Sequence, residues 1–191
     1  LYSISAWCQS EESLKEPINI SVKSEKVIKV AFGSCNKTDK DQPMWRAILK
    51  TDPDVFIWAG DNIYADSKDM NVFIKKYDTQ LNVEDYRMLS EATKIIGTWD
   101  DHDYGENDAG KEYPKKKESR DLALEFLKVD KSHPVWEREG MYQSYMLGDN
   151  DIKIILLDTR YFRDPLNKKG KKTIPNETGD ILGSAQWEWL D

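Results

Sequence analysis

The sequence predicts an α/β fold, because short apolar runs alternate along the chain with amphipathic stretches. Three apolar runs have the length of buried strands, at residues 27–32, 55–59 and 95–99. Apolar residues recur at helical spacing in the stretches that separate or follow these runs, at residues 44–49, 72–80, 83–89 and 120–127. This order of strands and helices is typical of a parallel sheet that helices cover.

The later elements depart from this alternation. Pro43 opens the first helix at a position where its missing N–H costs nothing. Residues 141–147 and 152–157 are apolar runs joined by a Gly-Asp-Asn-Asp turn, which indicates an antiparallel hairpin. Ser184 is expected to cap a last helix, which runs to the final residue of the sequence.

The length of 191 residues suits one domain with a substantial core. Residues 1–26 are polar and irregular, so we expect a leader or tether there and a domain over residues 27–191. The first ten residues resemble the tail of a bacterial lipoprotein signal in which Cys8 is lipidated. That interpretation implies an extracytoplasmic protein, periplasmic or at the cell surface, with a lipid anchor in the membrane. An ordinary terminus is the alternative, because Trp7 stands where a small residue is expected.

The chain is acidic, with a formal net charge of -7 and a pI near 5.0. Such a protein offers no general attraction to nucleic acid or to an anionic membrane, so we expect no nucleic-acid partner. Lysines gather only at residues 115–117 and 168–172, and solvated loops are expected at both places. The second group could draw an anionic substrate toward a site.

Two acidic segments directly follow predicted strands. The first is Gly-Asp-Asn-Ile-Tyr-Ala-Asp at residues 60–66, and the second is Thr-Trp-Asp-Asp-His-Asp-Tyr-Gly at residues 98–105. Loops at the carboxyl ends of parallel strands assemble the sites of α/β proteins, so these side chains should converge in one crevice. Crowded carboxylates repel one another unless cations or protons neutralise them, which predicts a metal site.

A third predicted strand has the same layout and ends in Gly-Ser-Cys-Asn at residues 33–36. Further segments are Leu-Asp-Thr-Arg-Tyr-Phe-Arg-Asp-Pro at 157–165 and Leu-Gly-Ser-Ala-Gln-Trp at 182–187. In this order, the segments resemble the PhoD-like branch of the calcineurin-type metallophosphoesterases. The resemblance implies a four-layer α-β-β-α sandwich, of which this chain would hold the N-terminal part.

The resemblance assigns metal ligands and catalytic groups by position. The ligands would be Cys35, Asp61, Tyr64 and Asp101, with Asp61 bridging two metal positions. His102 would be the catalytic imidazole and Asp103 the acid that orients it. The implied cofactors are two or more metal ions, Fe3+ with Ca2+, or else Zn2+, Mn2+ or Mg2+.

The implied reaction is hydrolysis of a small phosphate ester, as in an alkaline phosphatase or phosphodiesterase. The dinuclear site would polarise the phosphoryl oxygens, and a metal-bound hydroxide would attack phosphorus. Arg160 could clamp a phosphate oxygen, although a salt bridge with Asp158 or Asp164 is equally consistent with its position.

Ordinary structural roles compete with these assignments. Cys35 could be a small buried apolar residue, and Tyr64 could be a core aromatic residue. We expect three further acidic residues to act in turns or as helix caps: Asp66, Asp69 and Asp100. Two other functions also remain open: a thiol-dependent hydrolase that uses Cys35 as its nucleophile, and a degenerate surface-anchored binding module.

Only two histidines occur, His102 and His133, and His133 lies before a proline in a connection that we expect to be structural. The family supplies further imidazole ligands from later segments, so the resemblance implies residues beyond Asp191. The chain would then be a fragment, a cleaved subunit whose partner completes the site, or a degenerate relative. A Cys8–Cys35 disulfide is not expected, because it would consume a ligand.

Overall fold

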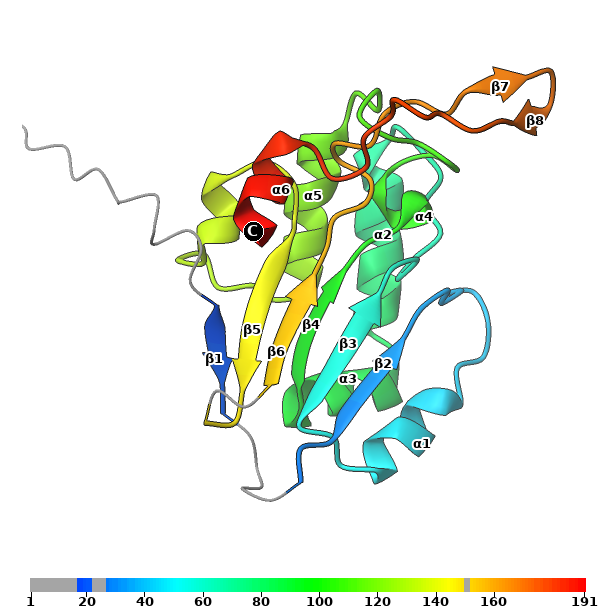
Figure 1. The fold of residues 1–191 in the computed structure, drawn as a ribbon. Coiled ribbons are helices and arrows are strands. Elements are labelled where there is room, and N and C mark those ends of the chain that lie inside the picture. Colours follow the sequence, from blue (N-terminus) through cyan, green and yellow to red (C-terminus); the bar gives the residue numbers. More distant parts are fainter. Residues whose placement is uncertain (1–16, 22–26, 150–151) are drawn as a thin grey trace, which may run out of the picture.

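The computed structural model describes residues 17–21, 27–149 and 152–191. Its strands form two three-stranded sheets and one two-stranded hairpin, and helices lie against the sheets (Figure 1). Among the described residues, none of the helices combines the length and apolar character needed to cross a lipid bilayer.

The first sheet contains β2 (Val30–Gly33), β3 (Val55–Ala59) and β4 (Lys94–Thr98), in the order β2-β3-β4. All its pairings are parallel, as the alternation of strands and helices predicts. Gly33 pairs with Trp58 and Ala59 pairs with Thr98, so the three strands end close to the same edge of the sheet. This alignment brings the three motif-bearing loops together.

Helices cover one face of this sheet. They are α1 (Met44–Lys50), α2 (Met70–Leu81), α3 (Glu84–Ala92) and α5 (Lys116–Phe126), while the short α4 (Asp101–Tyr104) follows β4 directly. Phe56 and Trp58 of β3 point into the helical layer and join the main hydrophobic core. The indole N–H of Trp58 donates to the Tyr86 hydroxyl at 3.0 Å, which satisfies a polar atom inside this core.

The second sheet has the order β1-β5-β6 and contains β1 (Ile18–Ile20), β5 (Gln143–Leu147) and β6 (Ile152–Leu156). β5 and β6 form the predicted antiparallel hairpin. β1 pairs in parallel with β5, so the expectation of irregular structure throughout residues 1–26 is wrong at this strand. Its alternation covers only three residues, and pairing with β5 supplies the hydrogen bonds that a sequence pattern cannot show.

A second core cluster joins the two sheets on the face opposite the helices. Val55 and Ile96 of the first sheet contribute to it, as do Tyr145, Leu147 and Leu156 of the second. This face is covered unevenly, because Val30 and Phe32 on the edge strand β2 are 39% and 75% exposed. The apolar surface of β2 therefore lies open on this side of the sheet.

The C-terminal part of the chain adds small elements around the sheets. They are a 3-10 helix (Pro134–Glu137), the hairpin of β7 (Lys168–Lys169) and β8 (Lys172–Thr173), and α6 (Ser184–Leu190). Residues 168–172, which we expected to form a loop, thus include a short hairpin. Gly183, with a φ of 74°, occupies the N-cap of α6, so the predicted cap at Ser184 is wrong by one residue.

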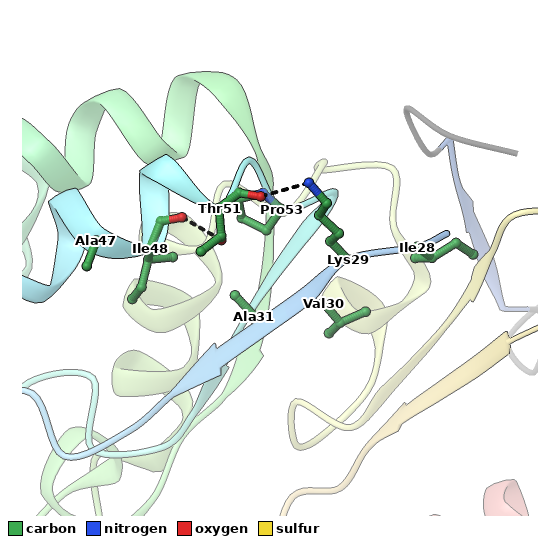
Figure 2. A pocket seen from close by; sticks show the side chains of 8 residues that line it. All are labelled: Ile28, Lys29, Val30, Ala31, Ala47, Ile48, Thr51 and Pro53. Atoms are coloured by element: carbon green, nitrogen blue, oxygen red, sulfur yellow. Dashed lines mark hydrogen bonds between the residues drawn. The ribbon is translucent and has the colours of Figure 1, made fainter. Parts of the chain in front are cut away.

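A cavity of about 640 Å³ lies between β2 and α1 (Figure 2). Its lining is mostly apolar, although Lys29 donates from Nζ to the carbonyl of Thr51 at 3.1 Å on its wall. Its walls include Ile28 and Lys29, which precede β2. The cavity thus lies toward the start of β2, whereas the acidic loops follow the strand ends, so it is separate from the site described next.

Candidate metal centre

The loops after β2, β3 and β4 carry the predicted site residues, and backbone hydrogen bonds tie the first two loops together. The N–H of Cys35 donates to the carbonyl of Gly60 at 3.2 Å, and the N–H of Asn36 donates to that of Asp61 at 2.8 Å. The Cys35 thiol comes within 3.7 Å of Asp61 Oδ2. The thiol and the carboxylate, which are 26 residues apart in sequence, thus face each other.

The backbone at this edge is strained. Cys35 and Asp61 have φ values of 58° and 51°, in the left-handed region that residues with a side chain seldom adopt. Gly60, with a φ of 100°, has the Cβ of Asp100 only 2.7 Å from where its own Cβ would stand. Glycine is therefore required there, and such strain is a recurrent feature of functional sites.

Asp61 lies at the centre of the site. Its side chain is buried, and Oδ1 has no hydrogen-bond partner among the described residues. Burial and the neighbouring Asp61 and Cys35 raise the pKa of the Tyr64 phenol. Burial raises the pKa of Asp61, although His102 and the Tyr64 phenol partly offset this effect. A buried carboxylate oxygen without a partner is costly unless a proton or a cation binds it.

Asp101 and His102 complete the cluster. Ligand atoms of Asp61, Asp101 and His102 all lie within 4.8 Å of one another. Burial by itself would raise the pKa of Asp101, but the backbone N–H of Asp108 and the guanidinium of Arg160 reverse the effect and lower it. Asp101 Oδ2 accepts from that N–H at 2.7 Å. Asp101 therefore favours its charged, cation-binding form.

His102 is oriented by Asp66, for which we expected a turn or helix-cap role. Asp66 Oδ1 lies 2.6 Å from His102 Nδ1, and the His102 ring lies 4.3 Å from that of Tyr64, centroid to centroid. Burial would lower the pKa of His102, but the surrounding carboxylates, Asp66 foremost, outweigh it and raise the pKa. The other two expected cap residues do act as caps, Asp69 at the start of α2 and Asp100 at the start of α4.

Asp103 has a different role from the predicted one. Its carboxylate is fully buried and accepts from the backbone N–H groups of Asp61, Asn62 and Asp100 at 3.2, 3.0 and 2.7 Å. Asp103 is the third residue of α4, and its side chain reaches back past the start of the helix to these N–H groups. The prediction that Asp103 orients His102 is therefore wrong, and Asp103 instead fixes the loop that carries Asp61.

Arg160 reaches the site from the loop after β6. Its Nε donates to Asp100 Oδ1 at 2.6 Å, and a terminal nitrogen lies 3.6 Å from Asp101 Oδ1. Neither of its predicted ion-pair partners, Asp158 and Asp164, takes that role. Sequence proximity suggested those two, whereas the fold brings the second acidic segment next to Arg160.

Asp158 is a structural residue that sequence reasoning missed. Its buried carboxylate accepts from the indole N–H of Trp99 and from the backbone N–H groups of Met141, Arg160 and Tyr161, each at 2.9 Å. Gln186 of α6 pairs with its backbone N–H and carbonyl, both at 2.8 Å. An acid directly after an apolar run, followed by Thr-Arg, was the available signal. Asp158 thereby holds the loop that presents Arg160.

His133 and two aromatic residues of the second acidic segment, Trp99 and Tyr104, have structural roles. His133 is buried, and its Nδ1 accepts from the N–H of Val135 at the start of the 3-10 helix, a structural role as predicted. Trp99 and Tyr104 are buried in the core. Cys35 is exposed and forms no disulfide with any described residue, and Cys8, with its predicted lipidation, lies outside the described residues.

The side chains at this edge fit a metal ion. Asp61 has a buried oxygen without a partner among the described residues, and a carboxylate oxygen of Asp101 and a ring nitrogen of His102 lie within 4.8 Å of a carboxylate oxygen of Asp61. Cys35 and Tyr64 add sulfur and phenol oxygen next to Asp61. Carboxylate, imidazole, phenol and thiol are donors that transition metals accept in mixed sets.

The fold and this donor set define a class, that of α/β proteins with a candidate metal centre at the carboxyl edge of a parallel sheet. The model of the family described as PhoD-like phosphatase matches residues 30–191 of the chain. This match covers most of the sequence, and the chain belongs to that family.

A solved structure, titled "Structure of PhoD", resembles this one with a TM-score of 0.66 and 19% sequence identity. The match covers 85% of this chain and 38% of that chain, so the present chain spans well under half of the solved protein. The match confirms the predicted fold class. No curated protein matches the chain.

Proposed function

We propose that this chain supplies part of the active site of a metal-dependent hydrolase of phosphate esters. The observation that carries this proposal is the buried carboxylate of Asp61, which has one oxygen without a hydrogen-bond partner among the described residues and lies next to Cys35, Tyr64, Asp101 and His102. Membership of a phosphatase family supports the same reaction class. The preferred substrates are small esters, because the acidic chain does not attract polyanions.

Asp61 would be a ligand shared by two metal ions, and Cys35, Tyr64 and Asp101 would be further ligands. The bound cations would polarise the phosphoryl oxygens and make water nucleophilic near neutral pH. His102 would protonate the leaving oxygen, with Asp66 fixing its ring and favouring its charged form. Arg160, which Asp100 holds beside the cluster, would stabilise negative charge on the substrate.

The parts of the proposed active site that this chain does not contain are inferred from the family. Further imidazole ligands and the second part of the sandwich would come from polypeptide outside residues 1–191, as another segment or a second chain. Among the described residues, His102 is the one imidazole of the cluster. Export and lipid anchoring through Cys8 remain predictions from the sequence.

A thiol-dependent hydrolase is less well supported. The Cys35 thiol faces the carboxylate of Asp61, whereas His102, the base that such a mechanism needs, is oriented by Asp66. A degenerate binding module would keep the same fold, and metal binding distinguishes it from the proposed enzyme.

Metal binding gives the first test. Titration of the chain with Mn2+ or Zn2+ followed by calorimetry should show binding that Asp61→Asn weakens at least about tenfold, since a central charged ligand is lost. Asp69→Asn, which removes an exposed carboxylate at a helix cap, is the matched control and should bind as the unmodified chain does. Equal affinities for the two variants would refute the metal centre.

The second test is hydrolysis of an aryl phosphate by a protein that also contains the polypeptide proposed to lie outside residues 1–191. Chelators should abolish turnover, and Asp66→Asn should lower it by about 10- to 100-fold while metal binding persists, because His102 loses its orienting partner. Activity that resists chelators and is lost on alkylation of Cys35 would favour the thiol mechanism instead.

A further inference from the structure

The hairpin of β7 and β8 carries four lysines within five residues, Lys168, Lys169, Lys171 and Lys172, around a turn at Gly170. All four are exposed. The hairpin projects away from the sheets and helices at the top right of Figure 1. A concentrated positive charge thus stands clear of an acidic protein with a net charge of -7.

The pairing of this hairpin places like charges together. Lys169 lies directly opposite Lys172 in the antiparallel register, an arrangement that destabilises a strand pair. Two-residue strands add little to offset it, since isolated hairpins are marginal in water. Within the part of the chain that the structure describes, none of the four lysines has an ion pair. The hairpin therefore holds uncompensated charge that an anionic partner would stabilise.

The other lysine group provides a contrast within the same chain. Lys115 pairs with Glu118 at 2.9 Å, and Lys117 pairs with Asp121 at 3.4 Å. The ammonium of Lys116 lies 4.3 Å from the ring centre of Tyr161. Among the described residues, these three lysines have partners on the protein itself, unlike the four lysines of the hairpin.

We propose that the β7–β8 hairpin is a contact site for an anionic lipid surface. Its four ammonium groups lie on a convex, projecting tip and would meet many headgroups at once, whereas a single phosphate is usually held in a concave cradle. Ile174, directly after β8, is 40% exposed and would enter the interfacial region. Lys168 lines a pocket together with the acidic residues Glu106, Asp108 and Glu112. Salt screens the acidic groups that lie farther from the hairpin than a Debye length of about 8 Å.

The proposal is independent of the proposed enzymatic function, and its test uses no activity. Purified chain without attached lipid is sedimented with vesicles of phosphatidylglycerol or of phosphatidylcholine. We expect binding to the anionic vesicles alone, and we expect high salt to abolish it. Binding to neither kind of vesicle would overturn the proposal.

Two double variants locate the contact. One is Lys169→Gln with Lys172→Gln, and the other is Lys115→Gln with Lys117→Gln. Both lose two positive charges and so have the same net charge. The hairpin variant should bind anionic vesicles about 30-fold more weakly, because each lysine lost near the surface weakens binding about fivefold. The control variant should bind as the unmodified chain does.

Equal losses in the two variants would show that net charge, and not the hairpin, governs binding, and would overturn the proposal. Binding of soluble polyphosphate by the hairpin without any vesicle binding would also overturn it, because the site would then take a free polyanion. Thermal unfolding followed by circular dichroism should show no loss of stability in the hairpin variant, since the substitutions remove a repulsion.

Discussion

Neighbouring residues of the second acidic segment take three separate roles. Asp100 pairs with Arg160, Asp101 joins the metal-ligand cluster, and Asp103 accepts from backbone N–H groups. All three are aspartates, so their roles differ only because of their positions on α4 and on the loop before it. The direction in which each side chain leaves the backbone decides which groups it meets.

The two histidines are also separated by their surroundings. Asp66 stabilises the charged form of His102. His133 is buried instead, and its Nδ1 must keep a lone pair to accept from Val135. Burial lowers the pKa of His133 to about 4. The folded protein therefore holds His133 neutral over a range of pH in which the unfolded chain protonates it.

This difference predicts a loss of stability in acid. Because the pKa of His133 is lower in the folded state, its protonation favours unfolding, and stability should fall as the pH drops from about 6.5 to about 4. We expect His133→Asn, which can cap the 3-10 helix without titrating, to remove about 2 kcal/mol of this loss. Urea unfolding of both proteins across this range measures it, and identical pH dependence would contradict the expectation.

At the scale of elements, the loop after β6 depends on one buried acid. The Asp158 carboxylate accepts from Trp99 just after β4, from Met141 before β5 and from N–H groups of its own loop, and Gln186 links the Asp158 backbone to α6. Elements far apart in the sequence thus meet at a single carboxylate. The position of Arg160 beside the metal-ligand cluster follows from this arrangement.

Removing this carboxylate should be costly. We expect Asp158→Ala to lower the free energy of unfolding by about 3 to 5 kcal/mol, because several buried N–H groups lose their acceptor. Asp164→Ala is the control in the same loop. Its carboxylate is more exposed, accepts from one backbone N–H and pairs with the exposed Lys111, so its loss should cost about 1 kcal/mol. Similar costs in urea denaturation would show that Asp158 has no special structural role.

Periodicity predicted the elements with strong patterns and missed the weak ones. β3, β4 and the helices α1 to α3 and α5 each carry a clear apolar period, and the structure places them within a few residues of the predicted bounds. β1 and the β7–β8 hairpin are too short to show a period. Their existence depends on pairing with a neighbour, which is tertiary information.

At the scale of the whole molecule, the two faces of the first sheet differ. Helices bury Phe56 completely between Trp45 and Trp58, with ring centres 5.3 and 5.4 Å away. Phe32 on the neighbouring strand is 75% exposed on the opposite face. The same residue type therefore contributes very differently to stability on adjacent strands.

A matched pair of substitutions measures this difference. We expect Phe56→Ala to cost about 3 to 5 kcal/mol, because it removes contacts and leaves a cavity. Phe32→Ala should change stability by no more than about 0.5 kcal/mol. Urea denaturation of both variants checks this, and a large cost at Phe32 would show that its face of the sheet is covered in solution.

The sequence by itself determined the fold class, the family and the loops that hold the site, because strand periodicity and short motifs are local properties. Only the tertiary structure decided the partners: Asp66 for His102, Asp100 for Arg160, and backbone N–H groups for Asp103. The physical reason is that a hydrogen bond or an ion pair depends on the distance and direction between side chains. The fold sets both, and the spacing of residues along the chain does not.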